Sequence, residues 1–196
     1  MALTLVTAAV TEPLSTGEFK DFARITDNTE DHLIDSWGLA AREKVEDDTR
    51  RALITQTWDW ILDEFPDSSG AVLTVPLPPL QSVTSITYVD TNGNSQIWAA
   101  ADYQVDTDST QGRIMPAYGQ SWPSTRDQMQ AVTVRFVAGY GDNAVDVPER
   151  LLNAMKVLVA TWYENREDVI IGVAANKMPA PVAYSRLIWP LRILMV

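Results

Sequence analysis

The sequence predicts an α+β protein with a helical core of two N-terminal helices and one long helix near the C-terminus, an inserted small antiparallel β module, and an extended apolar C-terminal tail. Apolar residues recur at helical spacing in residues 15–50 and again after residue 146. Between these segments, short runs alternate polar and apolar residues and are separated by turn residues. The chain is therefore divided into a helical core of residues 1–52 and 146–168, a β insertion of residues 53–145, and a tail of residues 169–196.

The first helix has a clear start signal at Ser15. Glu18 follows three residues later and completes a capping box. Leu14 and Phe19 stand at the positions of a hydrophobic staple. We expect a short helix that ends near Arg24.

A second, longer helix is predicted to end near Arg50. Asp27 and Glu30 repeat the capping pattern at its start. One apolar face is indicated by residues that recur every four positions: Leu33, Trp37, Ala41 and Val45.

The middle of the chain is predicted to form strands. Residues rich in Thr, Val, Ile and aromatic side chains favour strands. Asn92-Gly93 is a typical signal for a hairpin turn between two of them. The expected strands are Leu53–Phe65, Val72–Val75, Ser82–Asp90, Ser95–Trp98, Tyr103–Val105, Arg113–Met115 and Ala131–Val137.

Helical periodicity returns after Asp146, with Pro148 in the first turn. The apolar residues of this helix cover a wide arc, and only a thin polar stripe remains. Such a helix needs many neighbours, which a subunit interface or the core of a single subunit would supply. Both explanations are open for Leu151, Met155, Leu158 and Trp162.

The tail contains Pro179, Pro181 and Pro190, which exclude one long helix. A short helix from about Val182 to Trp189 is expected. The apolar ending of the chain favours docking into a partner over folding back onto its own core, since chain ends are usually solvated. The residues expected to dock are Leu187, Ile188, Trp189, Leu191, Ile193 and Leu194.

Composition narrows the class of function. The chain of 196 residues has a net charge of -11 and no cysteine, which excludes disulfides and thiolate metal sites and leaves no basic footprint for wrapping nucleic acid. The acidity is densest from Glu30 to Asp48, which indicates either a soluble surface or a surface that repels passing DNA. The apolar N-terminal residues lack the basic residues of a signal peptide, and no apolar run is long enough for a membrane span.

Motifs for catalysis are weak. His32 is the single histidine and lies in the acidic helix. The turn Gly139-Tyr140-Gly141 is followed by no Lys-Ser/Thr pair, and the paired carboxylates Asp47-Asp48 and Asp63-Glu64 are typical of acidic surfaces. We expect no catalytic, cofactor-binding or metal-binding residues.

Tryptophans offer one alternative site. Trp58 and Trp60 share one face of the expected strand and would form either a stacking platform for carbohydrate or bases, or part of the core. Trp122 lies in a loop, where it would pin the loop to the sheet or meet a neighbour.

Several short segments, in this order, resemble the head–tail connector (adaptor) family of tailed phages, in the branch with a β insertion that includes gene-transfer-agent adaptors. The resemblance covers residues 15–167, and the tail matches poorly. The segments are Arg51–Trp58 (RALITQTW), Pro76–Val83 (PLPPLQSV), Tyr103–Asp106 (YQVD), Gly112–Ile114 (GRI), Tyr118–Pro123 (YGQSWP) and Thr161–Glu167 (TWYENRE).

The resemblance implies a structural virion protein and no enzyme. It implies a twelvefold ring of this chain in the particle neck, assembled in the host cytoplasm, between the portal and a stopper or tail-completion protein. DNA would pass through the centre without specific binding, and no membrane is involved. In this interpretation the apolar tail seats in the portal, the helix after Asp146 contacts neighbouring copies, and three acidic residues face the channel: Glu43, Asp47 and Asp48.

Two other functions remain open on the sequence. A carbohydrate- or peptide-binding β module on a helical scaffold predicts Trp58 or Trp122 exposed in a groove. A metal-assisted hydrolase predicts a cleft with converging carboxylates.

Overall fold

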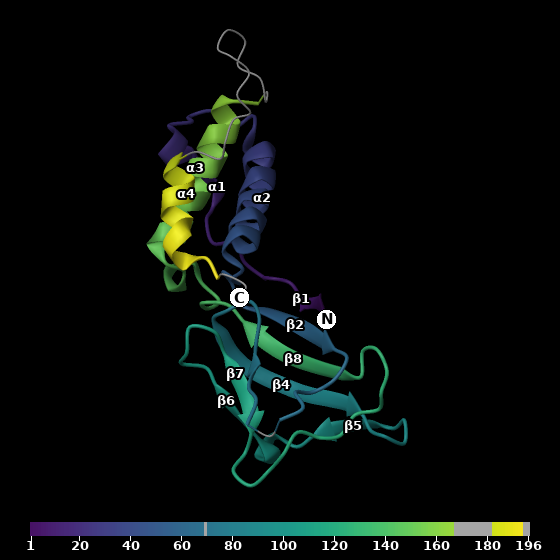
Figure 1. Ribbon diagram of the computed structural model, residues 1–196. Helices are drawn as coiled ribbons and strands as arrows, with labels where there is room; N and C mark the ends of the chain where they lie inside the picture. Colours follow the sequence, from purple (N-terminus) through teal and green to yellow (C-terminus); the bar gives the residue numbers. More distant parts are fainter. Residues whose placement is uncertain (69, 167–181, 194–196) are drawn as a thin grey trace, which may run out of the picture. The chain divides into compact units, whose positions relative to one another are not determined.

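The computed structural model describes residues 1–68, 70–166 and 182–193, which form four α-helices and two antiparallel sheets (Figure 1). The predicted α+β class is confirmed. Contacts within the chain define two units: a β unit of Met1–Val10 and Thr55–Tyr140, and a helical unit of Thr11–Ile54 and Gly141–Val196.

The N-terminal residues differ from the expectation, which placed residues 1–52 in the helical core. Ala2–Thr7 forms strand β1, which pairs antiparallel with β2 (Gln56–Leu62) in the β unit. In this pairing Leu3 lies opposite Trp60. The partner strand lies about fifty positions further along the chain, so local sequence patterns alone do not indicate the pairing.

The larger sheet has five strands in the order β1-β2-β8-β4-β5, where β8 is Val132–Ala138, β4 is Leu80–Val89 and β5 is Ser95–Trp98. Its register aligns apolar side chains in a row across one face, because opposite residues on neighbouring strands point the same way. One row consists of Leu3, Trp60, Val134, Ile86 and Trp98. The last four are buried, and Leu3 at the sheet edge is 40% exposed.

A smaller sheet has the order β3-β7-β6, with β3 at Leu73–Thr74, β7 at Arg113–Pro116 and β6 at Tyr103–Asp106. The predicted hairpin at Asn92-Gly93 is confirmed between β4 and β5. Gly93 has a φ of 89°, a conformation that glycine adopts without steric cost. The expected strand at Leu53–Phe65 is shorter than predicted, because Leu53 and Ile54 belong to the helical unit.

The helical unit consists of α1 (Thr16–Ala23), α2 (Asp31–Thr49), α3 (Glu149–Glu164) and α4 (Val182–Ile188), and α3 contacts each of the other three. Among the residues that the structure describes, no helix combines the length and the apolar character needed to cross a membrane.

The helix starts follow the sequence signals in part. The capping box of Ser15 and Glu18 is present as predicted. By contrast, α2 begins only at Asp31, because the Asp27 carboxylate accepts hydrogen bonds from Thr29 and closes a turn before the helix. Asp146, the expected cap of α3, lies in a short 3-10 turn that precedes this helix. Its carboxylate accepts a hydrogen bond from the backbone N–H of Asn143.

Candidate functional site

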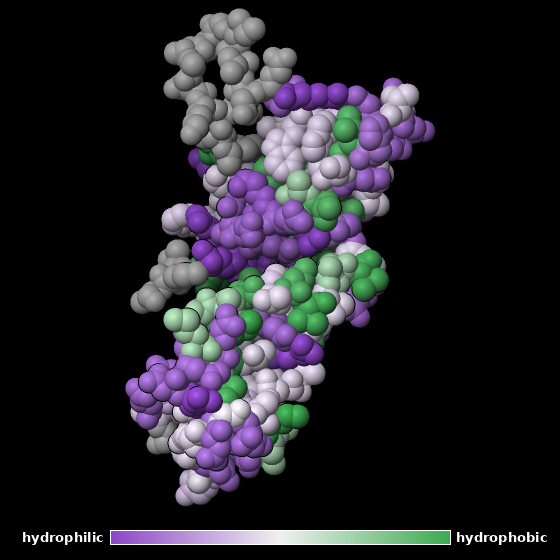
Figure 2. Space-filling model, turned by 90° about the vertical axis from the view of Figure 1, so that its right-hand side faces the viewer, coloured by the Kyte–Doolittle hydropathy of each residue, from purple (hydrophilic) through white to green (hydrophobic). Residues whose placement is uncertain are grey.

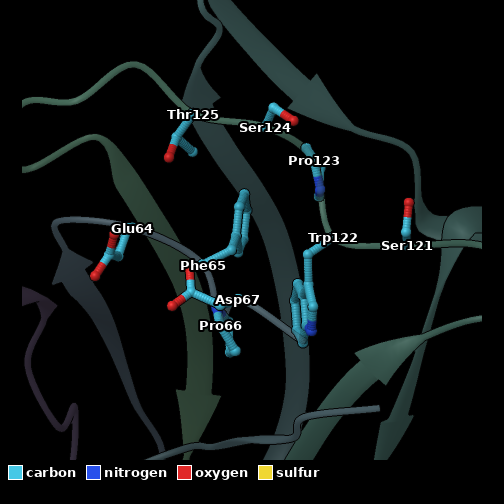
Figure 3. A pocket seen from close by; sticks show the side chains of 9 residues that line it. All are labelled: Glu64, Phe65, Pro66, Asp67, Ser121, Trp122, Pro123, Ser124 and Thr125. Carbon is cyan, nitrogen blue, oxygen red and sulfur yellow. The ribbon is translucent and has the colours of Figure 1, made fainter. Parts of the chain in front are cut away.

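A cavity of about 490 Å³ lies in the β unit between the loop after β2 and the loop before β8 (Figure 3). Phe65 and Trp122 stack there with ring centroids 5.2 Å apart, and the Trp122 indole donates to the Ala71 carbonyl at 3.2 Å. The remaining lining is Glu64, Pro66, Asp67, Ser121, Pro123, Ser124 and Thr125. The lining contains two carboxylates, Glu64 and Asp67, and no histidine or lysine.

The tryptophans of the proposed stacking platform are mostly covered. Trp60 is 5% exposed and Trp122 is 9% exposed, and Trp58 is half-buried with its indole donating to the Gln56 side chain at 3.1 Å. Trp122 also lies 5.2 Å from Trp98, so it pins its loop to the aromatic cluster of the β unit. The exposed aromatic groove that a carbohydrate-binding module requires is not formed by these residues.

The acidic residues of the helical unit occupy two different environments. Glu43 and Asp47 are exposed one turn apart on α2 and share a face of the helix. Asp48 is partly covered, because its carboxylate accepts from the Tyr184 hydroxyl at 2.6 Å and from Lys44 at 3.0 Å. The first two form an exposed acidic face, and the third holds α4 to α2. His32 is also exposed on α2, and no group of three or more metal-ligating side chains occurs in residues 1–68, 70–166 and 182–193.

The Tyr184 hydroxyl and the Asp48 carboxylate both have shifted pKa values. Burial, followed by the hydrogen bond to Asp48, raises the pKa of Tyr184. Burial acts to raise the pKa of Asp48, but the hydrogen bonds from Tyr184 and Lys44 outweigh it and leave that pKa below its ordinary value. The pair is therefore most stable as a neutral phenol that donates to a charged carboxylate.

The residues of α3 that were expected at a subunit interface lie mainly in the interior. Leu151, Met155 and Leu158 are each at most 1% exposed, so they pack within the chain itself. Of the two explanations that the sequence left open, the geometry of these three residues corresponds to a central core helix. Trp162 is half-buried and keeps part of its surface accessible.

The C-terminal segment folds back onto the end of α2. Three hydrogen bonds connect the two: Ile193 N to the Thr49 carbonyl (3.0 Å), Arg192 Nε to the Asp48 carbonyl (2.9 Å) and Arg51 Nε to the Leu191 carbonyl (2.7 Å). Carbonyls in the last turn of a helix have no partner within it, and here the tail supplies two of the donors.

This fold-back changes which tail residues are accessible. Ile188 is buried, whereas Trp189 is 67% exposed with the Arg192 guanidinium 5.8 Å from its ring centroid. Leu187, Leu191 and Ile193 are half-buried. Leu194 lies outside the described residues. The short helix expected at about Val182–Trp189 is present as α4, and residues 182–193 pack on the chain's own helical unit, the alternative to docking into a partner. Docking into the portal stays a prediction.

Comparison with solved structures finds chains of particle necks that have the same fold. A chain of the neck of an empty gene transfer agent (GTA) particle, computed with C6 symmetry, matches with a TM-score of 0.80 and 29% identity. A chain of the virion of a native GTA particle matches with a TM-score of 0.79 and 28% identity, and one of the neck of a native GTA particle, computed with C12 symmetry, with 0.78 and 28%. Each match covers 100% of this chain and 97% of the solved chain.

The chain has the fold of a virion neck protein. The matches cover 100% of this chain and so extend beyond residues 15–167, which carry the sequence motifs. The resemblance to gene-transfer-agent connectors is confirmed at the level of the neck of such a particle. No protein-family model and no curated protein matches the sequence.

Proposed function

We propose that the chain is an adaptor of a head–tail neck: a structural subunit without enzymatic activity that forms a ring between the portal and a stopper or tail-completion protein. The full-length similarity to neck chains of GTA particles supports this proposal. The C6 and C12 symmetries of those necks favour a closed ring of identical subunits, with twelve copies as the simplest number.

Residue roles follow from accessibility. On α3, Trp162 is the expected interface residue that still has exposed surface, while Leu151, Met155 and Leu158 support the helix from inside. In the C-terminal segment, Trp189 is the residue best placed to meet the portal. Glu43 and Asp47 form the face proposed to line the DNA channel, where like charge keeps phosphate from binding.

Deletion of the gene tests the function as a whole. We expect DNA-filled heads that lack tails, because an adaptor is needed before a stopper or tail can attach, and a plasmid copy should restore tailed particles. Electron microscopy of the purified particles makes the measurement. Normal tailed particles without this chain would rule out the proposed role.

Charge reversal tests the channel face. The double variant Glu43→Lys/Asp47→Lys is expected to lower DNA delivery by about tenfold or more, because lysines on the channel wall would bind passing phosphates. The matched control is Asp108→Lys/Asp127→Lys, which makes the same charge change at exposed sites of the β unit. Gene delivery per assembled particle is the readout. Equal delivery by the two variants would remove these two residues from the channel.

A further inference from the structure

Strand β1 forms one edge of the larger sheet and pairs, among the described residues, with β2 only. All six of its residues are exposed, including Leu3 at 40%, Leu5 at 45% and Val6 at 44%. The backbone groups on its outer side are therefore open to another strand or surface.

The other sheet edges are protected in ways that β1 is not. β5 and β6 have four residues each and β3 has two, and short edge strands offer little backbone for pairing. β1 has six residues without proline, and residues 1–10 carry no charged side chain. Proteins that stay monomeric normally prevent such an edge strand from pairing with another chain by placing lysine or proline in it or by covering it with a loop.

Apolar side chains extend this edge onto one sheet face. Leu3 and Leu5 lie opposite Trp60 and Trp58, so they continue the buried rows of the sheet beyond its covered part. Figure 2 shows the side of the molecule on which β1 lies in Figure 1, and hydrophobic residues gather on part of this face. A gathered apolar surface of this kind marks an interaction site more often than scattered apolar residues do.

Charge indicates which partner fits. The chain has a net charge of -11, so two copies repel each other across most of their surfaces. The uncharged N-terminal strand is where a second copy can approach without placing carboxylates against carboxylates. In the proposed ring each copy also has a neighbouring copy on either side.

Ring symmetry restricts the contact. Neighbours in a ring are joined head to tail, so the β1 edge of one copy meets a different surface of the next copy.

We propose that β1, through its open edge and the side chains of Leu3 and Leu5, is a contact surface for the neighbouring copy of this chain in the neck ring. The inference rests on the proposed function, because the ring supplies the neighbour. It adds an interface that lies in the β unit and is separate from α3 and the C-terminal segment.

Site-specific photocrosslinking tests the partner. A benzophenone-bearing phenylalanine analogue is placed at position 3 and, as a control, at position 118, where the fully exposed Tyr118 lies in the loop between β7 and β8. After irradiation of assembled particles, position 3 is expected to give a crosslinked dimer of this chain, and mass spectrometry identifies the joined peptides. Crosslinks from position 3 only within one chain, or only to a different neck protein, would overturn the inference.

A double substitution tests the contribution to assembly. Leu3→Glu/Leu5→Glu is expected to reduce incorporation into necks by at least about tenfold, the loss expected when two apolar contacts become carboxylates. The control Tyr118→Glu/Met129→Glu makes the same charge change at two residues that are each at least 85% exposed, and should assemble like the unchanged chain. Circular dichroism and thermal unfolding of the purified variants show whether both remain folded.

The outcomes separate the two proposals. If the unchanged chain is missing from purified necks, the proposed function fails. If it is present but the folded Leu3→Glu/Leu5→Glu variant assembles as well as its control, the adaptor role stands and the β1 interface is excluded.

Discussion

Replacing Phe136 with alanine is expected to lower the free energy of unfolding of the β unit by about 3–5 kcal/mol. Phe136 is fully buried in β8, the central strand of the larger sheet, and lies opposite Trp58 on one side and Val83 on the other. The substitution removes an aromatic ring from the middle of this row and leaves a cavity that two paired neighbouring strands cannot easily close.

Hydrogen exchange measures this effect best, because it reports on the two units of the chain separately. The amides of β2, β8 and β4 should lose protection strongly, and those of α2 and α3 much less. Val137→Ala is the matched control, since Val137 is the next residue on β8 and is half-buried on the opposite face. A loss below about 1 kcal/mol for Phe136→Ala would mean that this row is not the core of the sheet.

Local signals predicted the helices well. The Ser15 capping box and the spacing of apolar residues in α2 depend on neighbours three or four positions away, and both are visible in the sequence. The hairpin at Asn92-Gly93 is of the same kind, because the turn residues themselves set the backbone.

Long-range pairing limited the prediction elsewhere. Residues 2–7 form strand β1 because they pair with β2. Nothing in these six residues alone distinguishes an edge strand from an unpaired apolar chain end. Leu3 and Leu5 alternate with Thr4, as in a strand, but this alternation is too short to predict a strand. An uncharged stretch of ten residues at the start of an acidic chain was the one signal that could have drawn attention to it.

The candidate interface residues show a second limit of prediction from the sequence. The sequence periodicity correctly predicted that α3 is apolar on most of its surface. It cannot indicate whether another helix of the same chain or another copy covers that surface. Here α1, α2 and α4 cover it, so Leu151, Met155 and Leu158 lie inside. The exposed candidates, Trp162, Trp189, Glu43 and Asp47, are the ones that assembly can use.

Tyr184→Ala is expected to detach the C-terminal segment from the helical unit. Tyr184 is 1% exposed, and its hydroxyl donates to Asp48, so the substitution loses a buried ring and a charge-assisted hydrogen bond at once. The expected cost is about 3–5 kcal/mol to the docking of α4. Hydrogen exchange should show residues 182–193 unprotected while α1 and the first turns of α2 retain protection, and unchanged protection of α4 would contradict the expectation.

Tyr184→Phe separates the ring from its hydroxyl. This variant keeps the packing and loses the hydrogen bond, and the expected cost falls to about 1–2 kcal/mol because water can still reach the partly exposed Asp48 carboxylate. If it destabilised α4 as much as Tyr184→Ala, the hydrogen bond and not the ring would be the main contribution.

The hydrogen-bonded pair of Tyr184 and Asp48 predicts that the free energy of unfolding falls at both low and high pH. The pKa of Asp48 is lower in the folded chain than its ordinary 3.8, so its contribution is present above that pH and is lost as the carboxylate is protonated below it. The pKa of Tyr184 is raised above its ordinary 10.0, so its contribution is present below that pH and is lost above it, where the unfolded phenol ionises. Denaturant titrations followed by far-UV circular dichroism should show both losses in the unchanged chain. In Tyr184→Phe the loss above pH 10 should shrink, since no phenol remains at this position, and an identical alkaline limb in both proteins would show that Tyr184 does not hold the tail through Asp48.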